Sequence, residues 1–129
     1  MTDFRKFFTS SGKLVLSGKD AETNEKLIKQ VEKENIVLHT KEKGSPFAEI
    51  KAGGKKVTRK DIKEAAIYIA KFSQDWKKNR KDVVVHYFLG EDIFKSKNMK
   101  IGTFGVKKFK EIKVKKKEIE KFENANQYR

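Results

Sequence analysis

Short apolar runs alternate with polar turns along this 129-residue chain. Such runs, bounded by Gly, Ser, Asn or Asp, predict strands, and four of them fall in the first half. They cover residues 4–8, 13–17, 35–40 and 47–52. A fifth run, VVVHYFL over 83–89, is rich in β-branched and aromatic residues and predicts a central strand. Gly102 and Gly105 predict a turn inside a final hairpin over 101–114.

Two segments have helical spacing instead. Asp20 is placed to cap a shorter helix over 20–33. Thr58 is placed to cap a longer helix, with Asp61 in the capping-box position. The apolar stripe of this second helix continues to Trp76, and the helix is expected to end among the cations of 77–80.

This order of elements predicts an α+β fold, because strands and helices do not alternate in βαβ units. We expect a mainly antiparallel sheet with one long and one shorter helix packed on one side of it. The domain is expected to span 1–114. Residues 115–129 form a basic, polar tail that we expect to be weakly helical and to fray.

The net charge of the chain gives information on its binding partner. Lys and Arg number 32 against 18 Asp and Glu, a net charge of +14. A magnitude of about 2 to 8 suffices for solubility, and a larger imbalance destabilises the compact state by self-repulsion. A polyanionic partner, nucleic acid, explains the excess better than the alternative of a Lys-rich, heat-adapted composition, because Glu does not rise with Lys.

Several classes of function are disfavoured. The chain has no Cys, which excludes disulfides and thiolate metal sites. It has no apolar run long enough for a membrane span and no secretory leader, so we expect a cytoplasmic protein without membrane contact. Residues 12–20 differ from a phosphate-binding P-loop, because the glycine spacing is one residue too long and Asp20 replaces the required Ser or Thr. No cofactor is expected.

The positive charge is clustered. Residues 65–129 hold 17 basic and 8 acidic residues, and the run KKFKEIKVKKK over 107–117 holds seven Lys and one Glu. If about six cations neutralise phosphates, log K falls with log salt at a slope of roughly −5 on duplex or −4 on single strands. The candidate phosphate-binding residues in these clusters, with one at the start of the longer helix, are Arg59, Lys77, Lys78, Arg80, Lys95, Lys97, Lys100, Lys107 and Lys108.

A polar loop follows the predicted strand 35–40. His39 lies at the end of that strand, and Lys41, Lys43, Gly44 and Ser45 follow. Glycine allows close backbone approach, and the loop amides and Ser45 hydroxyl can bind a phosphate oxygen. An ordinary hairpin loop would use the same residue types, so both interpretations remain open from the residues alone.

An ordered set of short motifs resembles a known family. The matching pieces are Ser10-Ser11-Gly12, Gly18-Lys19-Asp20 with Asn24, Leu38-His39-Thr40-Lys41 with Gly44-Ser45, Glu64-Ala65-Ala66 leading to Phe72-Ser73 and Trp76, Val83-Val84-Val85, and Ile101-Gly102-Thr103-Phe104-Gly105-Val106. The chain thereby resembles, over about residues 4–114, the NFACT-R domain. That domain is the RNA-binding module of the NEMF and RqcH ribosome quality-control proteins and also occurs in free-standing archaeal versions.

The resemblance implies binding to structured RNA, with tRNA or ribosomal RNA as ligand and the large ribosomal subunit as a possible partner. It adds weight to the His39–Ser45 loop as a binding loop. The family's other domains are absent from this sequence, so a protein partner that supplies them is expected.

Two other classes remain open. One is an RNA-processing or RNA-modifying enzyme, or its accessory subunit, for which Asp20, His39 and Glu64 are the candidate residues. The other is a protein–protein adaptor on the ribosome. A non-catalytic RNA-binding domain is the function that the sequence favours.

Overall fold

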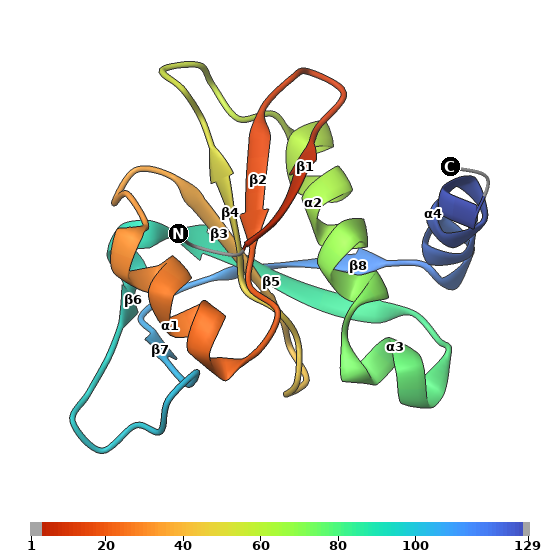
Figure 1. Ribbon diagram of the computed structural model, residues 1–129. Helices are drawn as coiled ribbons and strands as arrows, with labels where there is room; N and C mark the ends of the chain where they lie inside the picture. Colours follow the sequence, from red (N-terminus) through yellow and green to blue (C-terminus); the bar gives the residue numbers. More distant parts are fainter. Residues whose placement is uncertain (1–3, 128–129) are drawn as a thin grey trace.

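An antiparallel sheet of six strands forms the centre of the computed structural model, which describes residues 4–127 (Figure 1). Its strand order is β1-β2-β4-β3-β5-β8. These strands are β1 (Arg5–Phe8), β2 (Leu14–Ser17), β3 (Ile36–Thr40), β4 (Ala48–Lys51), β5 (Val83–Leu89) and β8 (Lys110–Val114). The helices are α1 (Ala21–Gln30), α2 (Arg59–Lys71), α3 (Gln74–Asn79) and α4 (Lys116–Gln127). The predicted α+β class with a mainly antiparallel sheet is confirmed.

The two longer N-terminal helices lie on opposite faces of the sheet. Side chains alternate between faces along a strand. Val15 therefore packs with Ile69 of α2 in one core, while its neighbour Leu16 packs with Leu27 of α1 in a second core. The expectation that both helices cover one side was wrong, because the central strands are apolar on both faces.

A break divides the long helix that the apolar stripe predicted. Helix α2 ends at Lys71, and α3 begins at Gln74 with Ser73 as its N-cap. The Ser73 hydroxyl accepts a hydrogen bond from the Trp76 amide at 3.1 Å and donates one to the Ala70 carbonyl at 2.7 Å. Ser73 has helical spacing from Ile69 and Trp76, but its hydroxyl starts a new helix instead of continuing the old one.

The predicted final hairpin over 101–114 was also wrong. Strand β7 (Gly105–Val106) pairs with β6 (Ile93–Phe94) in a separate small sheet, whereas β8 pairs with β5. A short 3₁₀ turn, η1 (Gly90–Asp92), precedes β6. Gly105 is required where it faces β6, because a Cβ there would lie 2.2 Å from the Phe94 ring. The glycine marks a close contact rather than a turn.

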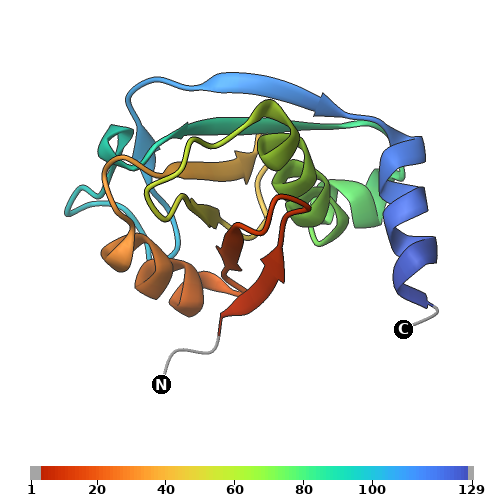
Figure 2. The ribbon, with the colours of Figure 1, turned by 90° about the horizontal axis from the view of Figure 1, so that it is seen from above.

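The C-terminal segment is part of the core. Helix α4 lies at the opposite end of the molecule from α1 (Figure 2), and its Ile119 is fully buried. The Glu123 carboxylate accepts a hydrogen bond from the Trp76 indole at 2.9 Å and two from Arg80 at 3.2 Å. The expected fraying is therefore corrected, because a buried side chain and a bonded indole fix this helix. The domain boundary at residue 114 stays a prediction.

A polar cluster, here called the buttress, joins the β1–β2 turn to the start of α2. Its members are Ser10, Ser11, Lys13, Asp61 and Glu64. Buried Lys13 and Asp61 form an ion pair at 2.9 Å, and the Ser11 hydroxyl donates to Asp61 at 2.6 Å. Glu64 accepts hydrogen bonds from the backbone amide and hydroxyl of Ser10 at 2.7 and 2.6 Å. The cluster fixes one end of α2 on the sheet.

Asp61 keeps its charge in this buried position. Burial alone would raise its pKa, but hydrogen bonds from Ser11, the Thr58 amide and Lys13 outweigh that effect and hold the pKa well below its usual range. Thr58 and Asp61 also form the capping box that the sequence predicted. Within residues 4–127, no helix has the length and apolar character needed to cross a membrane.

Candidate nucleic-acid-binding groove

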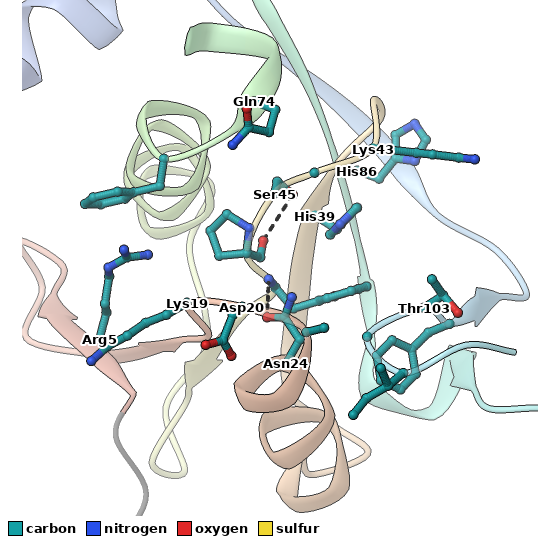
Figure 3. Close-up of a pocket in the computed structure, with 18 of the residues that line it drawn as sticks. Arg5, Lys19, Asp20, Asn24, His39, Lys43, Ser45, Gln74, His86 and Thr103 are labelled. Atoms are coloured by element: carbon teal, nitrogen blue, oxygen red, sulfur yellow. Dashed lines mark hydrogen bonds between the residues drawn. The ribbon is translucent and has the colours of Figure 1, made fainter.

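A cavity of about 630 Å³ lies at the C-terminal end of α2, between α3, the start of α1 and the β6–β7 loop (Figure 3). Here it is called the groove. Its walls come from the start of α1, the 43–47 segment, the start of α3 and the loop between β6 and β7. Beside the groove, Leu27 of α1 packs with Leu16, Val37 and Phe88 of the sheet.

Aromatic rings form the floor. His39 and His86 are direct cross-strand partners on β3 and β5, so both point from the same face. The His39 ring stacks on Phe47 at 4.1 Å between centroids, and Phe47 meets Phe104 edge to face at 5.3 Å. The His86 ring stacks on Phe109 at 4.0 Å. Stacking holds each imidazole in a fixed orientation.

The two histidines differ in their chemistry. Burial lowers the pKa of His39 to about 4, assisted by the neighbouring His86 and opposed by hydrogen bonds with the backbone of Thr40 and Ser45. His39 is therefore neutral at pH 7 and offers a flat aromatic surface rather than a charge. His86 accepts or donates a hydrogen bond with the Glu111 carboxylate at 2.9 Å.

Cations surround the floor. Arg5, Lys19, Lys43 and Lys77 line the groove, and Figure 3 shows Arg5 and Lys19 across from Lys43. The side chains of Lys43 and Lys77 form no ion pair within the described part of the chain. Among the described lining residues, Asp20 carries the only carboxylate. A phosphate in the groove would therefore meet a strongly positive field.

Asp20 has a structural task that limits its effect on an anion. Its carboxylate accepts hydrogen bonds from the Thr23 amide and hydroxyl, each at 2.9 Å, and caps α1 as predicted. These bonds lower its pKa. Buried Asn24, one turn into α1, accepts a hydrogen bond from the Phe47 amide at 3.1 Å. It thus ties α1 to the wall of the groove.

The loop after β3 is built as the sequence predicted, but its members do different things. Gly44 has a φ of +87°, and its carbonyl accepts a hydrogen bond from the Gln74 amide at 2.8 Å. The Ser45 hydroxyl accepts from the Thr40 amide at 3.1 Å and donates to the Pro46 carbonyl at 3.2 Å. Ser45 therefore shapes the loop. Lys43 lines the groove, whereas Lys41 is exposed outside it.

The cluster after α2 splits in a similar way. Lys77 lines the groove, and Lys78 is exposed outside it. Arg80 adopts the left-handed conformation with φ of 51°, lies 4.1 Å above the Trp76 ring, and bonds to Glu123. Its charge is balanced within the fold.

Lys95 holds the β6–β7 loop in place through hydrogen bonds. Its ammonium group donates to the Glu25 carboxylate, to the Lys100 carbonyl and, at 2.8 Å, to the Thr103 carbonyl. The Gly102 amide also donates to Glu25 at 2.8 Å, so this loop is fastened to α1 (Figure 1). Its far end, which includes Thr103, forms one wall of the groove.

The remaining predicted cations lie outside the groove. Lys97 and Lys100 are exposed on the β6–β7 loop, and Lys107 and Lys108 are exposed between β7 and β8. Arg59 is the first residue of α2, next to the buttress and about 20 Å along the helix from its groove end. The role of each of these residues in RNA binding stays a prediction.

The residues proposed for an enzyme are not brought together. Asp20 and His39 line the groove, but Glu64 lies in the buttress, bonded to Ser10. No cluster of three His, Asp or Glu within the described chain could hold a metal ion. The arrangement therefore lacks the shared pocket that this alternative required.

Sequence reasoning missed several lining residues, notably Arg5, Lys19, Phe72 and Gln74. Arg5 pairs with Ser17 in the β1–β2 ladder and lies 4.2 Å above the Phe72 ring. The only sequence signal was the predicted strand pairing, which brings residue 5 close to 17–19. Phe72 and Gln74 reach the groove because the helix breaks at Ser73.

An aromatic floor with cations on both sides is typical of nucleic-acid-binding domains. The family model "NFACT protein RNA binding domain" matches residues 3–108. The chain belongs to this family, as the resemblance implied.

The chain is also similar to two individual proteins. It is 36% identical over 92 residues to the Archaeal Rqc2 homolog aRqcH of Methanocaldococcus jannaschii, a match that covers 70% of this chain and 14% of that protein. It is similar in fold to the C-terminal part of the fibronectin/fibrinogen-binding protein from Streptococcus suis, with a TM-score of 0.79 and 18% identity. That match covers 94% of this chain and 49% of the solved chain. The chain thus spans a small part of the curated relative's length.

Proposed function

We propose that this domain binds structured RNA, tRNA or ribosomal RNA, without catalysing a reaction on it. The observation that carries the proposal is the groove, where Lys43 and Lys77 form no ion pair within the described chain and Asp20, the one carboxylate among the described lining residues, is already used as a helix cap. Membership of an RNA-binding domain family supports the same class of ligand.

The groove supplies both parts of RNA recognition. Lys43, with Arg5 and Lys19 across from it and Lys77 also lining the groove, is placed to neutralise phosphates along a bound strand. The outer lysines, such as Lys78 and Lys107, would extend this field over a larger ligand. Rings on the floor provide apolar contact for bases or sugars, which distinguishes RNA from a featureless polyanion.

The biological setting proposed is the cytoplasmic ribosome. The curated relative is named as a homologue of the ribosome quality-control protein Rqc2, and it is far longer than this chain. We therefore propose that the domain works on or near the large ribosomal subunit.

The test is a titration of fluorescently labelled tRNA, random duplex DNA and large ribosomal subunits at several salt concentrations. We expect tRNA or the subunit to bind at least about tenfold more tightly than DNA of equal charge. The double variant Lys43→Gln/Lys77→Gln should lower affinity for tRNA on the order of tenfold and flatten the salt dependence.

A matched control uses two lysines away from the groove. Lys55 and Lys56 are exposed in the loop before α2, so Lys55→Gln/Lys56→Gln removes the same net charge at a distant site. Its affinity for tRNA should stay close to that of the unmodified protein. Equal affinity for tRNA and random DNA would contradict the proposal, as would equal losses in the two double variants.

A further inference from the structure

The floor of the groove differs from a surface that only binds phosphates. Its centre is occupied by two imidazole rings, His39 and His86, with Phe47 and Phe104 beside them. The cations stand around this floor and not on it. A ligand that used charge alone would gain nothing from the aromatic centre.

His39 is uncharged, which further distinguishes the floor from a surface that binds phosphates by charge. With a pKa of about 4, its ring carries no charge at pH 7. A neutral, flat and half-buried ring is suited to stack on a nucleobase, because every base presents a π-face. The side chain of Gln74, which lines the groove and is exposed, adds an amide donor and acceptor near the same place.

The size of the groove limits what reaches the floor. Its volume of about 630 Å³ lies within the range of about 300–1,000 Å³ that is usual for small-molecule pockets. In an A-form duplex the bases are stacked inside and cannot be presented face-on to protein rings. A single unstacked nucleotide, by contrast, brings one base and two flanking phosphates, which matches an aromatic floor between opposite groups of cations.

Resting on the proposed RNA-binding function, we propose that the groove takes one unpaired nucleotide of a structured RNA. Its base stacks on the ring of His39 or His86. Its flanking phosphates lie against Lys43 and, across the groove, against Arg5, with Lys77 also within the lining. The recognised feature is thus a bulge, loop or single-stranded end, not a continuous helix.

The experiment compares three labelled RNA duplexes in fluorescence anisotropy: a blunt duplex, the same duplex with one bulged nucleotide, and the same bulge without its base. The bulged duplex should bind about five- to tenfold more tightly than the other two, a difference typical of one stacked base. A 2-aminopurine in the bulge should lose fluorescence when protein is added, because stacking quenches it.

Protein variants assign the effect to the floor. The double variant His39→Ala/His86→Ala removes both candidate stacking rings and should abolish the preference for the bulged duplex over the blunt one. Folding is checked by circular dichroism because the His39 ring packs on Phe47. The matched control is Phe8→Ala, which removes an aromatic ring that is 66% exposed on β1 outside the groove. It should leave the preference intact.

The outcomes separate this inference from the function on which it rests. If the base-less bulge binds as tightly as the complete one, the unpaired-nucleotide site is overturned. If tRNA binding is then still weakened by Lys43→Gln/Lys77→Gln, the general RNA-binding function stands. If tRNA binds no better than random DNA, both proposals fall together.

Discussion

The buttress and the groove lie at the two ends of helix α2, and they use charge in opposite ways. In the buttress, Lys13 is buried against Asp61 and each acidic group accepts several hydrogen bonds. In the groove, Lys43 and Lys77 are exposed, and Asp20, the one lining carboxylate of the described residues, is used in a cap. A balanced charge holds the fold together, whereas an unbalanced charge at an aromatic floor is suited to a ligand.

The largest effect is expected where the buttress is broken. Asp61→Ala leaves the buried ammonium of Lys13 without its partner, which should lower the free energy of unfolding by about 3–5 kcal/mol. Urea denaturation at neutral pH measures this change. Glu34→Ala, at an exposed turn residue, is the control and should change stability by less than about 0.5 kcal/mol. Similar midpoints for the two variants would show that the pair has no stabilising role.

As the pH falls, the free energy of unfolding should decrease in two steps, the first due to His39 in the groove and the second due to Asp61 in the buttress. The folded pKa of His39 is about 4, below its usual 6.5, so the unfolded chain binds more protons and stability falls as pH drops from about 6.5 towards 4. Asp61 has a depressed pKa, so its contribution is complete above its usual value of 3.8 and is lost only below it.

Thermal denaturation across pH 3–7 checks this order. His39→Gln should remove the decline between about pH 6.5 and 4, and Asp61→Asn should reduce the further decline at lower pH. A single decline below pH 4 in the unmodified protein would contradict the assignment of the first step to His39.

Smaller effects are expected from substituting Lys77 and Arg80, two cations that are three residues apart. Lys77→Gln should weaken tRNA binding about three- to tenfold and change stability by less than about 0.5 kcal/mol. Arg80→Gln should do the reverse, because its guanidinium is bonded to Glu123 and stacked on Trp76. We expect it to cost about 1 kcal/mol of stability with little change in affinity. Equal losses of affinity would return Arg80 to the RNA-binding set.

The smallest expected effect is on the salt dependence. Each groove lysine that neutralises a phosphate on an unpaired strand contributes about 0.7 to the slope of log K against log salt. Lys43→Gln should therefore reduce the magnitude of the slope by roughly that amount, while Lys55→Gln should not. Identical slopes for these two variants would remove Lys43 from the phosphate contacts.

The strands were predictable because their signals are local. Alternating apolar runs between turn residues gave the approximate limits of β2, β3 and β5, and Thr58 and Asp61 gave the start of α2. Features that depend on distant contacts were not predictable. Gly105 resembled a turn residue, but its reason is the Phe94 ring on another strand.

The groove residues follow the same rule: those close together in the sequence were predicted, and those brought in by distant contacts were not. His39, Lys43 and Gly44 lie within six residues of one another, at the end of β3 and in the loop that follows, so a local motif identified them. Arg5 and Lys19 reach the same groove through the β1–β2 pairing, which no single stretch of sequence displays. Arg80 and Lys95 were chosen because they belong to basic runs, but their acidic partners, Glu123 and Glu25, are 43 and 70 residues away in the chain.

The bond between Trp76 and Glu123 has a consequence for how the protein is made. Trp76 is the sole tryptophan, and its partner is 47 residues further along the chain. At a synthesis rate of about 5–20 residues per second, the indole waits roughly 2 to 9 seconds before Glu123 has been added. Its fluorescence emission should shift to shorter wavelength as α4 docks and completes its burial. The fluorescence of Trp76 therefore reports the last step of folding, in which α4 docks.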